Sequence, residues 1–220
     1  MTSPDVAASG SSASAIWNLP NVLTMLRIVL VPFFVWFLVL DAPGLESAAG
    51  VWRWAAFACF AIAIYTDKLD GDIARSRGLV TDFGKIADPI ADKLLTGSAL
   101  VMLSILGELP WWITIVILVR EWGITALRFF VIRYGVIPAS KGGKLKTVVQ
   151  TAAILLYLFP LTVGTAWLGI VALVVMLAAV AVTVWTGVDY VVEALKLRNA
   201  GRAASGNTGD AGDAGDPAAR

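Results

Sequence analysis

The sequence predicts an all-α protein that crosses a membrane six times. Of its 220 residues, 58% are hydrophobic and only 15% are charged, whereas a soluble domain carries about 25% charged residues. A spanning helix needs about 20 mainly apolar residues, and the chain offers six such stretches. We expect spans at residues 19–40, 51–72, 86–107, 110–133, 146–163 and 167–190.

Each span follows from an apolar run. The first contains Arg27 as its only charged residue before Asp41, and residues 51–66 contain only Arg53. The third and fourth are built around the uncharged stretches 94–107 and 109–119, and each extends past its polar end. Residues 147–188 carry no charge and are long enough for the last two spans, with a turn near Gly164.

The two ends of the chain differ in composition from the rest. The first fifteen residues lack the positive charge of a signal peptide. Residues 1–14 are rich in Ser and Ala, and residues 197–220 are rich in Gly, Ala and Asp, so both are expected to be disordered tails. One membrane domain at residues 15–196 remains between them.

Basic residues gather on one side of the predicted topology. With six spans, Arg53 is the only basic residue near the opposite side. By the positive-inside rule, the side that carries the other basic residues is expected to be cytoplasmic. We therefore expect a multi-pass protein of a bacterial plasma (inner) membrane with both termini in the cytoplasm. No basic stripe suited to nucleic acid occurs elsewhere. The chain has no histidine, which excludes histidine metal ligands and Ser-His-Asp catalysis.

Acidic residues cluster at the end of the second span and the start of the third. Asp67 and Asp70 are three residues apart and Asp88 and Asp92 are four apart, so each pair shares a helix face. The loop between the helices is short, so the four carboxylates are expected to converge at the cytoplasmic boundary. Ionisable residues in spans are costly and usually functional.

Converging carboxylates repel one another unless protons or cations neutralise them. Oxygen ligands suit hard cations, Mg²⁺ above all and also Mn²⁺, and a pair of such ions serves phosphoryl chemistry. The alternative is a set of surface charges paired with neighbouring Lys and Arg. Near the acids, Arg75 offers a bidentate fork to phosphate, while Gly71, Ala74 and Gly84 allow close approach of a ligand or helix.

The residues at 67–92 form the pattern D-x2-D-G-x2-A-R-x8-G-x3-D-x3-D, from Asp67 to Asp92. This pattern resembles the signature of the CDP-alcohol phosphotransferases, and every fixed position is filled. The similarity extends over about residues 18–150, and several segments resemble the bacterial phosphatidylglycerophosphate synthase branch of that family. The resemblance implies that family's six-helix fold, a CDP-diacylglycerol donor and a homodimer in contact with membrane lipids.

The resemblance also implies roles for individual residues. Asp67, Asp70 and Asp88 would ligate two divalent metal ions, and Asp92 would contact the second ion and act as the catalytic base. The CDP-lipid would be bound by residues at the amino-terminal end of the first span and by residues within the signature. These are Asn21, Thr24, Gly71, Ala74, Arg75, Thr81 and Gly84.

The acceptor is a separate expectation. Several basic residues could converge on an acceptor phosphate, which favours glycerol 3-phosphate over serine or free inositol. They are Arg120, Arg128, Lys141, Lys144 and Lys146. Alternatively, the lysines are only the cytoplasmic positive charges that many membrane proteins carry, and Arg120 forms an ion pair with Glu121. Inositol phosphate and phosphatidylglycerol are the other candidate acceptors. Arg27 could serve the phosphate pocket or cap the helix bundle.

Two other classes of protein use membrane carboxylates. Intramembrane prenyltransferases carry two Asp motifs far apart in the chain, whereas here both pairs lie within 67–92. Transporters tend to show repeats or broken helices at the midplane, and the sequence has no evident repeat. CMP release in detergent solution would separate an enzyme from a transporter.

Overall fold

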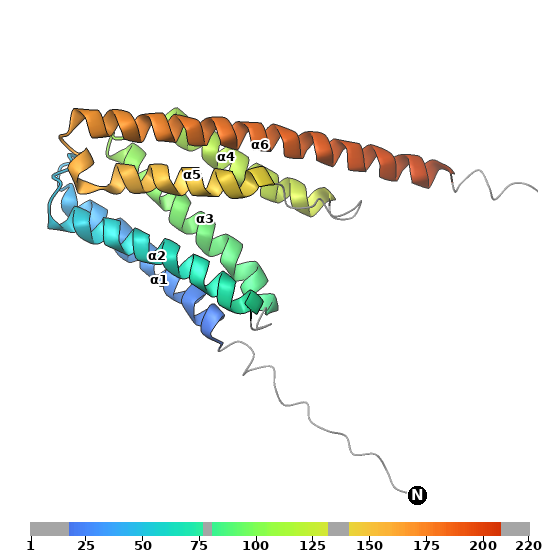
Figure 1. Ribbon diagram of the computed structural model, residues 1–220, viewed down its shortest axis with the longest axis horizontal. Coiled ribbons are helices and arrows are strands. Elements are labelled where there is room, and N and C mark those ends of the chain that lie inside the picture. The colour runs from blue at the N-terminus through green and yellow to red at the C-terminus, as the bar shows by residue number, and fades with distance from the viewer. Residues whose placement is uncertain (1–17, 77–80, 132–140, 208–220) are drawn as a thin grey trace, which may run out of the picture. The chain divides into compact units, whose positions relative to one another are not determined.

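The computed structural model describes residues 18–76, 81–131 and 141–207, and these residues are helical apart from short connections (Figure 1). The helices are α1 (Leu19–Asp41), α2 (Val51–Ser76), α3 (Asp82–Ile105), α4 (Trp111–Val131), α5 (Lys141–Leu158), the 3-10 helix η1 (Pro160–Thr162) and α6 (Ala166–Asn207). The all-α expectation is confirmed, and each α-helix overlaps one predicted span.

Two of the described helices, Leu19–Asp41 and Ala166–Arg198, are long and apolar enough to cross a membrane. Helices α2, α3 and α5 each include a charged end, where the acidic signature or a run of lysines lies, and this lowers their mean hydropathy. Length and apolar composition therefore identify only two of the described helices as spans, and the six-span topology stays a prediction. Several boundaries differ from expectation: α5 begins and ends five residues before the predicted span 146–163, α2 ends four residues late and α3 begins four residues early. The largest difference is in α6, which continues to Asn207, into the segment predicted to be a tail from residue 197. The predicted tail at 1–14 lies outside the described residues.

The chain forms two compact units. The first comprises residues 1–109 and 154–169, and therefore α1, α2, α3, the end of α5 and η1. Helix α1 packs against both α2 and α3. Fully buried Phe34 of α1 meets Phe60 of α2 with ring centroids 5.5 Å apart. Ala56 and Ala63 are also fully buried on α2, and such small residues let helices approach closely.

One end of the first unit is held by the buried guanidinium of Arg53. It pairs with both carboxylate oxygens of Glu108 and donates to the carbonyl oxygens of Tyr157 (2.8 Å) and Leu158 (3.3 Å). These contacts tie the start of α2 to the α3–α4 connection and to the end of α5. Asp41 accepts from the backbone N–H groups of the first turn of α2, and so completes the joint.

Glu108→Gln is expected to lower the free energy of unfolding by about 2 kcal/mol, because Arg53 would keep a buried charge without its partner. The estimate is below that for a fully buried pair because the Glu108 side chain is partly exposed. Thermal unfolding in detergent would measure the loss. Glu46→Gln, a change at an exposed acid nearby, is the control, and equal melting of the two variants would contradict the role of the pair.

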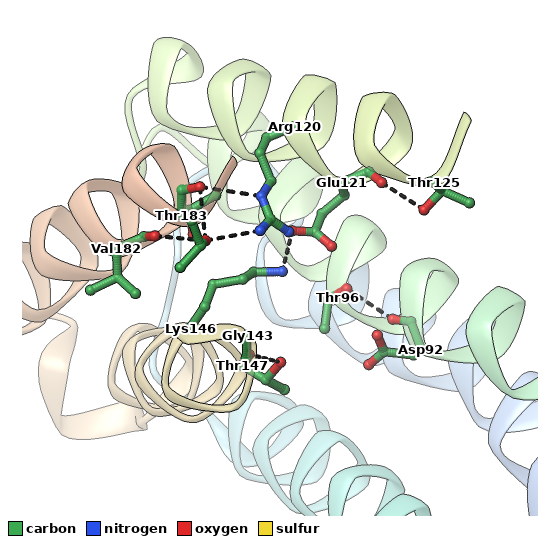
Figure 2. Close-up of polar contacts among 11 residues, drawn as sticks. Asp92, Thr96, Arg120, Glu121, Thr125, Gly143, Lys146, Thr147, Val182 and Thr183 are labelled. Atoms are coloured by element: carbon green, nitrogen blue, oxygen red, sulfur yellow. Dashed lines mark hydrogen bonds and ion pairs between the residues drawn. The ribbon is translucent and has the colours of Figure 1, made fainter. Parts of the chain in front are cut away.

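The second unit comprises residues 110–153 and 170–220, and its described part contains α4, most of α5 and most of α6. Ile113 and Ile117 of α4 are fully buried, as are Ala172 and Met176 of α6. The spacing of four residues places each pair on one helix face. Polar side chains of all three helices meet farther along this unit (Figure 2).

Candidate active site

The amino ends of α1 and α3 are joined by their capping residues. The Asn18 side chain accepts from the Asn21 N–H at 3.0 Å, and the Thr81 hydroxyl oxygen accepts from the Gly84 N–H at 3.0 Å. Both caps satisfy backbone donors that have no partner within the helix. The Thr81 hydroxyl then donates to Oδ1 of buried Asn21 at 2.9 Å. Two predicted donor-site residues that are far apart in the chain are thus in direct contact.

Gly84 and Thr24 complete this junction around Asp88. A Cβ atom at Gly84 would lie 3.0 Å from Oδ1 of Asn21 and 3.2 Å from Oγ1 of Thr81, so any larger residue would crowd the joint. The buried Thr24 hydroxyl donates to Oδ1 of Asp88 at 2.5 Å. Asp88 is therefore oriented by a side chain of α1.

Arg27 occupies the space between two aspartates of the signature. Its guanidinium is fully buried and forms ion pairs of 2.5 Å with Asp67 and with Asp70. The described partners of the Arg27 guanidinium are thus two aspartates of the signature. The signal in the sequence was the spacing of three between Asn21, Thr24 and Arg27, which places them on one face of α1.

The four carboxylates can be compared with the needs of a divalent ion. Asp88 is near enough to Asp67 and Asp70 for its charge to act on both. Among the described residues, however, no group of three or more acidic side chains is placed to hold an ion as it stands. The oxygen donors fit a hard divalent cation, whereas the geometry shown balances Asp67 and Asp70 with Arg27.

Asp92 lies one turn after Asp88 on α3 and is half-buried. Its backbone carbonyl accepts from the Thr96 hydroxyl at 2.8 Å (Figure 2). The spacing of four residues places it on the face of Asp88, as the sequence predicted.

The remaining signature residues lie at the end of α2. Arg75 pairs with Asp72 at 2.9 Å, and both side chains are exposed. An exposed pair of this kind contributes little stability, so the guanidinium can exchange Asp72 for a phosphate. A Cβ atom at Gly71 would lie 3.2 Å from the Arg75 guanidinium. Ala74, on the same turn, is half-buried.

In the second unit, the predicted acceptor residues Arg120 and Lys146 share one carboxylate. The ammonium of Lys146 pairs with Oε1 of Glu121, and Nη1 of Arg120 lies 3.3 Å from the same atom (Figure 2). The expected alternative, that Arg120 pairs with Glu121, is thus seen. Glu121 therefore holds two basic side chains from α4 and α5.

The other predicted acceptor residues are placed differently. The Arg128 guanidinium carbon lies 5.8 Å from the centre of the Tyr190 ring, a cation–π contact. Lys144 is exposed on the first turn of α5. Lys141 begins the same helix, and its side chain lies outside the described residues.

The complete acidic signature lies on α2 and α3, and the capped junction lies beside it; the family match shows that such a chain is a transferase of phospholipid synthesis. The chain belongs to the CDP-alcohol phosphatidyltransferase family, whose model matches residues 17–185.

Several curated relatives align over most of their length. A "probable phosphatidylglycerophosphate synthase" of Mycobacterium tuberculosis is 56% identical over 181 residues, 82% of this chain and 83% of the relative. A CDP-diacylglycerol–glycerol-3-phosphate 3-phosphatidyltransferase of Bacillus subtilis is 37% identical over 84% of this chain and 100% of its own. One of the same name from Rickettsia typhi is 38% identical over 79% and 94%.

Proposed function

We propose that the protein transfers the phosphatidyl group of CDP-diacylglycerol to a hydroxyl of sn-glycerol 3-phosphate, giving phosphatidylglycerophosphate and CMP. The reaction belongs to phospholipid biosynthesis, on the route to phosphatidylglycerol and cardiolipin. The observation that carries the proposal is the complete acidic signature in a chain similar, over most of its length, to relatives named for this reaction.

The donor would be bound in the first unit. Asn21, Thr24, Thr81 and Gly84 form the capped junction of α1 and α3, where backbone N–H groups and helix dipoles favour an anion. The same CDP-lipid would be contacted from the end of α2 by Gly71, Ala74 and Arg75. The Arg75 guanidinium would donate two hydrogen bonds to one phosphate.

Four aspartates would hold two divalent cations, Mg²⁺ in the first place and Mn²⁺ as the alternative. The ligands would be Asp67, Asp70, Asp88 and Asp92, all of them oxygen donors. When bound, the ions neutralise charge on the pyrophosphate and on the departing CMP. Support comes from the placement of Asp67 and Asp70 within one turn of α2, where both lie beside the same guanidinium.

Asp92 would act as the base. The acceptor oxygen forms a bond to the lipid-side phosphorus, the bond from that phosphorus to the CMP oxygen breaks, and the hydroxyl proton passes to the Asp92 carboxylate. The chain has no histidine, so a carboxylate is the available group for this step.

The acceptor phosphate would be bound by the basic residues of the second unit. Its proposed ligands are Arg120, Arg128, Lys141, Lys144 and Lys146. Support comes from the Arg120–Glu121–Lys146 cluster, which brings two basic side chains to one place. A phosphate on the acceptor can accept hydrogen bonds from both, whereas serine and free inositol carry no phosphate. Inositol phosphate also bears a phosphate, and phosphatidylglycerol is a further acceptor of the same chemistry.

The membrane setting completes the proposal. A lipid donor keeps its acyl chains in the bilayer, so a site at the cytoplasmic boundary meets both the lipid and a soluble acceptor. We place six spans in the bacterial plasma membrane with both termini and the active site cytoplasmic, as the basic residues favour. The enzyme would act as a homodimer, as the family resemblance suggests.

An acceptor panel tests the proposal. Purified protein would receive CDP-diacylglycerol and Mg²⁺, and CMP release would be measured with glycerol 3-phosphate, inositol phosphate, serine or phosphatidylglycerol. We expect release with glycerol 3-phosphate alone. Release with a different acceptor would contradict the assigned substrate and keep the reaction class, and no release with any acceptor would contradict both.

A further inference from the structure

Helix α6 holds the guanidinium of Arg120 at two points. Nε of Arg120 donates to the backbone carbonyl of Thr183 at 3.2 Å, and Nη2 donates to the hydroxyl oxygen of Thr186 at 2.9 Å (Figure 2). The Thr186 hydroxyl in turn donates to the carbonyl of Val182 at 2.8 Å. Because a hydroxyl has one proton and two lone pairs, this bond turns an acceptor lone pair towards the arginine.

Gly187 makes room for the stem of the same arginine. A Cβ atom there would lie 3.1 Å from Cγ of Arg120 and 3.4 Å from its Nε. Such contacts are tighter than ordinary van der Waals separations, so any side chain at this position would displace the arginine or the helix. The absence of a side chain at Gly187 is therefore part of how Arg120 is positioned.

The same face of α6 contacts the second arginine of α4. Tyr190 presents its ring to Arg128, and it lies one turn beyond Thr186 and Gly187. Spacings of three and four residues place these groups on one side of a helix. We name this side the arginine-facing side of α6, formed by Thr183, Thr186, Gly187 and Tyr190.

Ordinary helix packing would not explain the polarity of this side. Elsewhere α6 buries Ala172, Met176 and Ala179, which are apolar, whereas at this level it buries Thr183 and Thr186. Thr186 supplies its hydroxyl oxygen and Thr183 its backbone carbonyl oxygen to one guanidinium. Glu121 pairs with both Arg120 and Lys146, so the Arg120 guanidinium is held from α4 and α6 together.

We infer that the arginine-facing side of α6 positions Arg120 and Arg128 for the acceptor phosphate and so determines affinity for a phosphate-bearing acceptor. The inference rests on the proposed function. It assigns a role to a helix in which the sequence showed no motif. Its residues act through the arginines and are positioning residues.

The first test compares variants of α6 in the purified enzyme. Thr186→Val removes the hydroxyl at nearly constant shape, and Thr186→Ser restores it. We expect Thr186→Val and Gly187→Ala each to raise KM for glycerol 3-phosphate by about fivefold, because one hydrogen bond to a charged group is lost or displaced. KM for CDP-diacylglycerol should stay unchanged. Thr186→Ser and Val188→Ala, the latter at an exposed position of α6, should resemble the wild type.

Tyr190 provides a matched pair. Tyr190→Phe keeps the aromatic ring and should keep the wild-type KM for glycerol 3-phosphate, whereas Tyr190→Leu loses the cation–π contact and should raise that KM by about two- to threefold. A purely structural role of the tyrosine would instead alter both substrates' KM values together.

Arg120→Lys separates the inference from the function on which it rests. If Arg120→Lys raises KM for glycerol 3-phosphate while Thr186→Val and Gly187→Ala leave it unchanged, the positioning role is overturned and the proposed function stands. If Arg120→Lys itself leaves that KM unchanged, the phosphate role of Arg120 is wrong and the inference fails with it. Equal increases in both substrates' KM values in the α6 variants would also overturn it.

Discussion

Asp88→Asn is expected to reduce turnover by about a thousandfold. Asn keeps the shape of the side chain and an oxygen that can accept from Thr24, so the junction of α1 and α3 should persist. The negative charge is lost, and with it the strongest attraction for a divalent ion. CMP release per purified molecule would measure the effect.

Two controls make this result specific. Glu193→Gln neutralises an exposed acid on α6, far along the chain from the signature, and should leave turnover unchanged. The melting temperature of Asp88→Asn without added metal should remain near that of the wild type. Near-normal turnover in Asp88→Asn would overturn the carboxylate-bound metal mechanism.

Arg27→Gln should produce the largest loss of stability. The variant leaves Asp67 and Asp70 without their buried counter-charge, and Asp88 adds to the repulsion between them. Removing one partner of a buried ion pair costs about 3–5 kcal/mol of unfolding free energy. The loss should be seen in EDTA by thermal unfolding in detergent.

Magnesium should partly reverse this loss. A divalent ion can replace the missing positive charge, so Mg²⁺ should stabilise Arg27→Gln more than it stabilises the wild type. Arg27→Lys retains a charge without the planar fork and should lie between the two. If Mg²⁺ shifts the wild type and Arg27→Gln equally, Arg27 does not compensate the charge of the metal ligands.

The sequence predicted the helices well because their signal is local. Long apolar runs and their interruptions gave all six α-helices. The length of α6 was underestimated because a Gly- and Ala-rich composition after residue 197 suggested disorder. The chain has no proline there before Pro217, and an established helix propagates at little cost. Amino-acid composition does not show whether a helix that has already formed will continue into the next segment.

The site was predicted in part. Spacing alone put the aspartates on shared faces, and the family resemblance brought in Asn21, Thr24 and Thr81. In the structure Thr81 donates to the Asn21 side chain, and Thr24 donates to Asp88. The partners of Arg27 and Arg120 lie on other helices, and pairings between distant segments leave no periodic trace in one sequence. Among the described residues no group of three or more acids is placed to hold an ion, and Arg27 pairs with two of the four aspartates, so the metal site stays a prediction.

The most direct test of the central claim is the lipid product formed from radiolabelled glycerol 3-phosphate. Purified enzyme with CDP-diacylglycerol and Mg²⁺ should move the label into a lipid with the mass of phosphatidylglycerophosphate, in equal amount to the CMP released. EDTA or Asp92→Asn should abolish both products. CMP release without labelled lipid, or labelled lipid formed equally well by Asp92→Asn, would contradict the account.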